Sequence, residues 1–143
     1  MRDDRFEGVC FCGAVEIEVA GEPFASGLCH CESCRKWHSA PVNAWAIWPD
    51  AALRVVSGEE ALTQYSREGP EGPSNRTSCG LCGGALFNRK PRVAMTVVYA
   101  MTLAGSGFRF EPTFHCFYGE GVLHMADGLP KFEDLPSNLG GSG

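Results

Sequence analysis

The chain has 143 residues, of which 44% are hydrophobic and 20% charged, and its formal net charge is −5. This length and composition suffice for one hydrophobic core, so we expect a single domain over residues 1–143. The acidic balance and the lack of any run of Lys or Arg argue against nucleic acid and anionic membranes as partners.

The N-terminal residues 1–5 are charged and lead into no apolar segment of the kind found in secretion signals. No uninterrupted apolar run is long enough to span a membrane. We therefore expect a protein of the reducing cytoplasm, where free thiols are available to zinc. Nothing in the pattern indicates an oligomeric state.

The predicted elements are mostly strands. At 15–19, three β-branched residues alternate with two glutamates, which predicts an antiparallel strand with one buried and one wet face. A short helix is expected at 33–38, with Ser33 as its N-cap. Further strands, separated by glycines and prolines, are predicted at 42–48, 53–56, 61–65, 85–88, 93–101 and 114–118. Residues 68–75 are typical of a loop, and 133–143 of a flexible tail.

Seven of the eight cysteines fall into three clusters, which are Cys10-x-Cys12, Cys29-x-Cys31-x-x-Cys34 and Cys79-x-x-Cys82. An even number of cysteines suggests disulfides in a secreted protein, but a C-x-C pair is too tight to close comfortably on itself. The chain is also long for a scaffold that depends on disulfides. The spacing therefore favours metal ligation.

The clusters divide into one set of four and one set of three. Cys29, Cys31 and Cys34 are close enough in sequence to hold one ion, whereas each two-cysteine cluster needs a partner elsewhere in the chain. The two pairs complete each other most simply, which predicts a structural zinc site of four thiolates. Three protein ligands leave an exchangeable position, as in catalytic zinc sites. We therefore expect two zinc ions per chain, one structural and one catalytic.

Four stretches of the sequence carry a family resemblance. They are Cys10-Phe11-Cys12-Gly13-Ala14-Val15, Cys29-His30-Cys31-Glu32-Ser33-Cys34-Arg35-Lys36-Trp37-His38, Ser78-Cys79-Gly80-Leu81-Cys82-Gly83 and Asp127-Gly128-Leu129-Pro130. In order and spacing, over about residues 8–132, they resemble the glutathione-dependent formaldehyde-activating enzyme family, which also includes centromere protein V. The resemblance implies a mainly β fold, a β-tent of coiled antiparallel sheets stabilised by zinc with one short helix.

The resemblance also implies an activity. It is that of a carbon–sulfur lyase that joins glutathione and formaldehyde to S-hydroxymethylglutathione, with glutathione or another small thiol and a small aldehyde as partners. We therefore expect Cys29, Cys31 and Cys34 to be catalytic together with His30, and the thiol of the cosubstrate to be activated at the zinc of the three cysteines. The alternatives are a noncatalytic zinc-binding interaction module of the same fold and a zinc hydrolase that uses metal-bound water.

The other candidates lie close to the middle cluster. His30 is expected to line the pocket or to hydrogen-bond a sulfur, and His115 either faces the site or is a satisfied core histidine. Arg35 is the candidate for a glutathione carboxylate, and Trp37 for a pocket wall. His38 follows Cys34 by four residues and would close the second zinc site if it ligates. Another residue, Cys116, has no cysteine near it in sequence, and we expect a buried, unreactive thiol there.

Overall fold

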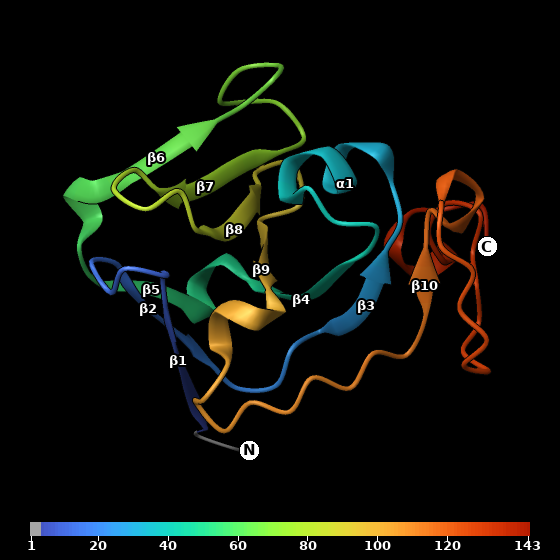
Figure 1. Cartoon of the computed structure of the whole chain (residues 1–143), viewed down its shortest axis with the longest axis horizontal. Coiled ribbons are helices and arrows are strands. Elements are labelled where there is room, and N and C mark those ends of the chain that lie inside the picture. The colour runs from blue at the N-terminus through green and yellow to red at the C-terminus, as the bar shows by residue number, and fades with distance from the viewer. Residues whose placement is uncertain (1–3) are drawn as a thin grey trace. The chain divides into compact units, whose positions relative to one another are not determined.

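The computed structural model describes residues 4–143, so residues 1–3 of the charged N-terminus lie outside it. Over the described residues the protein is mainly β, with ten strands in two sheets and one α-helix (Figure 1). This confirms the predicted fold class. The strands and the helix are β1 (Arg5–Val9), β2 (Glu16–Ala20), β3 (Ala25–Cys29), α1 (Glu32–His38), β4 (Asn43–Pro49), β5 (Leu53–Ser57), β6 (Leu62–Tyr65), β7 (Asn75–Cys79), β8 (Ala85–Lys90), β9 (Met95–Tyr99) and β10 (His115–Cys116).

The chain divides into two compact units. The first contains the described residues up to Phe24 together with Ala46–Arg109, and the second contains Ala25–Trp45 and Phe110–Gly143. Strand β4 begins in the second unit and ends in the first. Each unit is thus built from two separate stretches of chain, and the expected single domain stays a prediction.

In the first unit, β1, β2 and β5 form an antiparallel sheet with β2 in the centre. Val15, Ile17 and Val19 are fully buried, which confirms the predicted strand and its buried face. Opposite Ile17 lies Gly8, where a Cβ atom would come within 2.9 Å of the isoleucine side chain. A glycine is therefore needed there for the close approach of the two strands.

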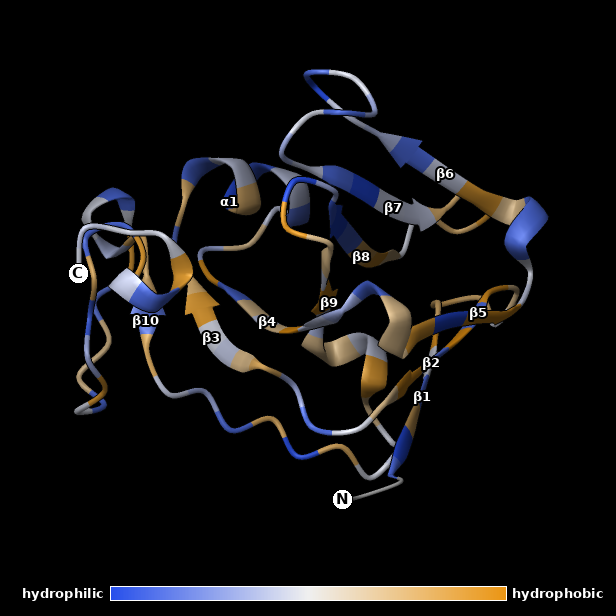
Figure 2. Cartoon of the chain, turned by 180° about the vertical axis from the view of Figure 1, so that it is seen from behind, coloured by the Kyte–Doolittle hydropathy of each residue, from blue (hydrophilic) through white to orange (hydrophobic). Residues whose placement is uncertain are grey.

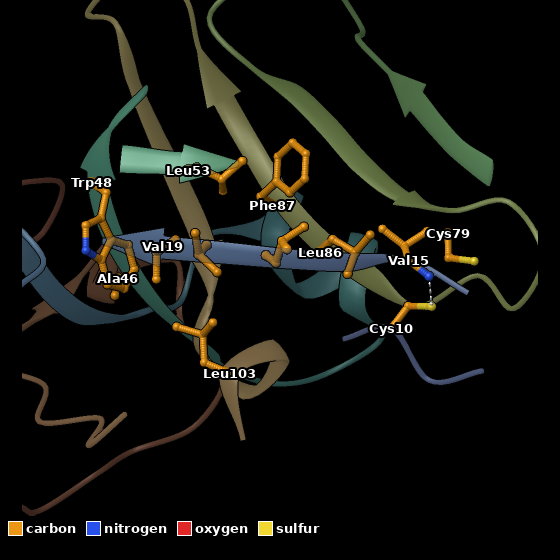
Figure 3. Packing of buried hydrophobic residues seen from close by; sticks show 12 residues of the cluster. Cys10, Val15, Val19, Ala46, Trp48, Leu53, Cys79, Leu86, Phe87 and Leu103 are labelled. Atoms are coloured by element: carbon orange, nitrogen blue, oxygen red, sulfur yellow. Dashed lines mark hydrogen bonds between the residues drawn. The ribbon is translucent and has the colours of Figure 1, made fainter. Parts of the chain in front are cut away.

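The other strands of the first unit include β6, β7, β8 and β9, which pair antiparallel in chain order. The buried core of this unit lies between their apolar side chains and those of β2, as Figure 3 shows for Leu86, Phe87 and Val19. Cys10 and Cys79 belong to the same buried cluster. Two of the predicted ligands therefore lie against the core.

In the second unit, β3 and β10 pair in parallel, with Cys116 opposite Cys29, and α1 follows β3 after two residues (Figure 1). Most of α1 is hydrophilic (Figure 2), and none of its residues is fully buried. Strand β10 is shorter than the predicted strand at 114–118. It ends at Cys116 because Phe117 has φ of 52°, a left-handed conformation that a strand cannot contain.

Three strands, β1, β3 and β7, were not predicted, and the predicted N-cap is wrong. The cap of α1 is Cys31, whose sulfur accepts a hydrogen bond from the backbone N–H of Cys34, so Ser33 lies inside the helix. The predicted loop at 68–75 ends one residue early, because Asn75 begins β7. Within residues 133–143 the chain forms a short 3-10 turn, Ser137–Leu139. None of the helices in residues 4–143 has the length and apolar character required to cross a membrane.

Candidate metal centres

The first candidate metal centre lies in the first unit, where two hairpin turns meet. Cys10 follows β1 and Cys12 lies in the turn to β2, whereas Cys79 ends β7 and Cys82 lies in the turn to β8. Their four sulfurs all lie within 4.8 Å of one another. The structure therefore brings together the two pairs that the sequence predicted to complete each other.

The two turns bend the backbone in a similar way. The N–H of Gly13 donates to the carbonyl of Cys10 (3.1 Å), and the N–H of Gly83 donates to the carbonyl of Cys79 (2.7 Å). Both glycines have positive φ, at 86° and 78°. Glycine adopts this conformation at little cost, which lets each pair of thiols face the same point.

The sulfur separations fit a tetrahedral ion. Sulfurs at about 2.3 Å from a zinc ion would lie about 3.8 Å from each other at tetrahedral angles. The Cys12 sulfur lies 3.7 Å from that of Cys10 and 3.8 Å from that of Cys79. A disulfide requires about 2.05 Å, and all eight cysteines are free. The geometry thus supports metal ligation over disulfide formation.

Backbone N–H groups donate hydrogen bonds to sulfurs of this first cluster, which favours the negatively charged form of the thiols. N–H groups donate to the sulfurs of three ligands, from Val15 to Cys10 (3.2 Å; Figure 3), from Leu81 to Cys79 (3.4 Å) and from Gly84 to Cys82 (3.4 Å). The amide of Gly84 is the main reason why the pKa of the Cys82 thiol falls to about 6. Such donors stabilise thiolates, the form in which cysteine binds a metal.

The second candidate centre lies in the second unit and has three sulfurs. Cys29 ends β3, Cys31 caps α1 and Cys34 lies in its first turn, and their sulfurs also lie within 4.8 Å of one another. Cys29 is buried, whereas Cys31 and Cys34 are only partly buried. The end of β3 and the start of α1 therefore hold the three thiols together, and two of these thiols are partly exposed to solvent.

The second cluster is crowded with thiols. The thiol of Cys116, which is 2% exposed, lies on the neighbouring strand beside that of Cys29. The contacts of Cys29 with the thiols of Cys116 and Cys31 raise its pKa far above the ordinary range. Packed thiols cannot all lose their protons unless a positive charge compensates them, so the donor set fits a divalent cation. The expected burial of Cys116 is confirmed.

No histidine belongs to either group of ligands in the part of the chain that the structure describes. Neither His38 nor His30, which lies between Cys29 and Cys31 in the sequence, belongs to these groups. The candidate ligand sets are two groups of cysteines, four in the first unit and three in the second.

His30 takes part in a buried chain of hydrogen bonds instead. Its Nε2 lies 2.8 Å from Nδ1 of His115, and Nε2 of His115 lies 2.6 Å from a carboxylate oxygen of Asp127. Both histidines are fully buried. Burial lowers the pKa of the His30 imidazole, and the neighbouring His115 adds to the effect. Both ring nitrogens of His115 are thus engaged, as in a satisfied core histidine.

Arg35 and Trp37 lie on α1, beside the second cluster. The Arg35 guanidinium donates through Nε to the carbonyl of His30 (2.9 Å) and through one Nη to the carbonyl of Glu120 (2.8 Å). Its other N–H groups remain candidates for a substrate carboxylate. Trp37 is half-buried. Their roles as substrate contacts stay predictions.

Some neighbours of the second cluster were not predicted. A side-chain oxygen of Glu120 accepts from the backbone N–H of Glu32 at the start of α1 (3.0 Å). The rings of His30 and Tyr118 are in edge contact, with centroids 4.8 Å apart. The only signal of Asp127 was the Asp-Gly-Leu-Pro motif, which gave no indication that its carboxylate contacts a histidine.

Comparison with known proteins identifies the family. The family model of the glutathione-dependent formaldehyde-activating enzyme matches residues 5–120. The chain belongs to this family. The matched range contains all seven clustered cysteines, His30 and His115, and it ends before Asp127.

Two further proteins are similar to this family member. An uncharacterized lyase of Schizosaccharomyces pombe is 30% identical over 83 residues, which is 58% of this chain and 56% of the relative. The chain thus matches only about half the length of that curated relative. A crystal structure of a Rhodobacter sphaeroides protein has a TM-score of 0.53 and 31% identity, covering 69% of this chain and 88% of the other.

Proposed function

We propose that this protein is a zinc-dependent carbon–sulfur lyase that forms or cleaves the adduct of a small thiol and a small aldehyde, with glutathione and formaldehyde as the first pair to test. The family match supports the class of reaction, and the lyase name of the yeast relative agrees with it. Free, clustered thiols suit a reducing compartment, so we expect the reaction in the cytoplasm.

The difference between the two cysteine clusters carries this proposal. Four thiolates saturate a zinc ion, whereas three leave it able to accept a further ligand. Cys29, Cys31 and Cys34 form the set of three, and two of them are partly exposed. A zinc ion held there would supply a Lewis acid that stabilises a thiolate at neutral pH.

The side chains around this cluster have separate roles in the proposal. Arg35 is already held against two backbone carbonyls, so its remaining N–H groups face a fixed direction and can bind a carboxylate of the thiol substrate. Trp37 offers an apolar surface beside it. His30 lies between two of these cysteines in the sequence and is fully buried.

The test is the rate of adduct formation in a variant of the second cluster. Cys34→Ser removes one ligand from the partly exposed set, so we expect it to lose one of two bound zinc ions and the activity while the first unit stays folded. Rates are measured by NMR as the formation of S-hydroxymethylglutathione above the uncatalysed rate, and zinc by elemental analysis.

Ser33→Ala is the matched control, because Ser33 lies in the same helix but is neither a ligand nor the cap. It should retain both ions and full activity. Turnover that survives in Cys34→Ser would refute the proposal. A wild-type protein that binds two ions and shows no rate above the uncatalysed one would favour the noncatalytic interaction module.

A further inference from the structure

The motif Asp127-Gly128-Leu129-Pro130 is not used by the zinc clusters, yet its aspartate begins a chain of contacts that ends beside the second one. The carboxylate of Asp127 contacts Nε2 of His115 (2.6 Å), and Nδ1 of His115 contacts Nε2 of His30 (2.8 Å). His30 lies between the ligands Cys29 and Cys31. A residue of the C-terminal segment is thus linked to the second cluster through two buried rings.

Asp127 itself is firmly held. Its Oδ1 accepts from the backbone N–H of Leu129 (3.1 Å) and from the ammonium of Lys131 (3.0 Å), so that Oδ2 is left to His115. These donors, with His115 first, keep the pKa of the Asp127 carboxyl well below its usual range. The carboxylate is therefore ionised and can only accept hydrogen bonds.

The ionised carboxylate determines which ring nitrogens of His115 and His30 carry a proton. Because Asp127 only accepts, His115 must carry its proton on Nε2. With a neutral ring, Nδ1 of His115 then accepts from the Nε2–H of His30, and Nδ1 of His30 is left without a proton. In the opposite arrangement, His115 would carry protons on both nitrogens and His30 would carry its proton on Nδ1. This would place a cationic ring and an unpaired N–H in a fully buried space, which costs more free energy than an unpaired acceptor.

The free nitrogen of His30 agrees with this assignment. Among the described residues its Nδ1 is buried and has no hydrogen-bond partner. It faces Gly121, where a Cβ atom would lie only 3.1 Å from it. The backbone of residue 121 therefore packs directly against this nitrogen, and a side chain at residue 121 would crowd the His30 ring.

We propose that Asp127 is a positioning residue, which acts through His115 to hold His30, the residue between Cys29 and Cys31 in the sequence, in one ring orientation and in the Nε2–H tautomer. An effect of this orientation on turnover at the second cluster rests on the proposed function, whereas the tautomer does not.

The test is a long-range ¹H–¹⁵N correlation spectrum of the histidine rings in the zinc-loaded protein. We expect His30 and His115 both to carry their proton on Nε2. In Asp127→Asn, the amide oxygen stays with its two donors, Leu129 N–H and Lys131, and the NH₂ group faces His115. Both rings must then move their proton to Nδ1, which is a change that loss of packing alone would not produce.

Two variants serve as controls. Lys131→Met removes a charge from the same carboxylate but leaves the oxygen that contacts His115, and Asp134→Asn changes an aspartate of the same unit that accepts from Ser142. Neither should change the tautomers. A wild-type His30 protonated on Nδ1, or unchanged tautomers in folded Asp127→Asn, would overturn the proposal. If Asp127→Asn does not fold, the wild-type spectrum still decides.

Kinetics give the second measurement. Asp127→Asn should lower kcat about 10- to 100-fold, the usual effect of losing a hydrogen-bond partner in the surroundings of metal ligands, with little change in KM for the thiol. Unchanged kcat in a variant with inverted tautomers would refute an effect of the His30 orientation on turnover. If the wild-type protein has no activity, the proposed function fails, and the spectrum alone still tests the positioning by Asp127.

Discussion

Single residues of the four-sulfur cluster are expected to carry much of the stability of the first unit. A structural zinc ion contributes about 10–16 kcal/mol of apparent folding free energy in small peptides, against about 5–15 kcal/mol for the net stability of a typical domain. Cys82→Ser removes one thiolate, and we expect loss of this ion and unfolding of the first unit, measured by circular dichroism and zinc analysis.

The matched control is Leu81→Ala, one residue away. Leu81 lies between Cys79 and Cys82 in the sequence. Its side chain is 75% exposed and therefore contributes little to the core. This variant should bind both ions and melt within a few degrees of the wild-type protein. A soluble Cys82→Ser protein with normal melting would rule out the structural role of the cluster.

Gly58 is a second residue whose replacement should be costly. It has φ of 81°, and a Cβ atom would lie 2.0 Å from the carbonyl oxygen of Ala14. Gly58→Ala therefore combines left-handed strain of about 1–2 kcal/mol with a backbone clash. Gly69 has φ of 88° but open space around it, so Gly69→Ala should show the strain alone. Equal free energies of unfolding for the two variants, by urea titration, would contradict this.

At the scale of elements, the sequence predicts strands well where burial follows hydrophobicity. β2 alternates apolar and acidic residues, and its apolar face is buried as expected. β7 also alternates, but two of the three residues that it buries are polar, Asn75 and Thr77, so a pattern of apolar residues cannot reveal it. β3 contains Gly27, which the ring of Trp45 covers, and close packing of this kind is a tertiary property.

The end of α1 offers a prediction at this scale. Ser39 caps the helix with φ of 50°, a conformation that glycine adopts more easily. Ser39→Gly relieves this strain but makes the unfolded chain more flexible, and we expect a net stabilisation of about 0.5 kcal/mol. Ser33→Gly, inside the same helix, should instead destabilise by about 0.5 kcal/mol. Thermal unfolding measures both, and a lower melting temperature for Ser39→Gly would contradict the strain.

At the scale of the whole molecule, the candidate ligands could be predicted because the cysteines occur in three short stretches of the sequence. Counting thiols then suffices to divide them into four and three, and the structure brings both sets together. The contact between His30 and His115 could not be predicted in this way, because 85 residues separate them and only the pairing of β3 with β10 brings them together. The role of Arg35 in holding two carbonyls also depends on the folded chain.

The central claim is that one cluster is closed and the other accepts a further ligand. The most direct measurement is a titration with glutathione of the protein loaded with Co²⁺, whose visible bands report the ligands of the ion. We predict a saturable change that involves one of the two bound ions and is absent in Cys34→Ser. Two bound ions with no saturable change in the wild-type protein, or the same change in Cys34→Ser, would contradict the account.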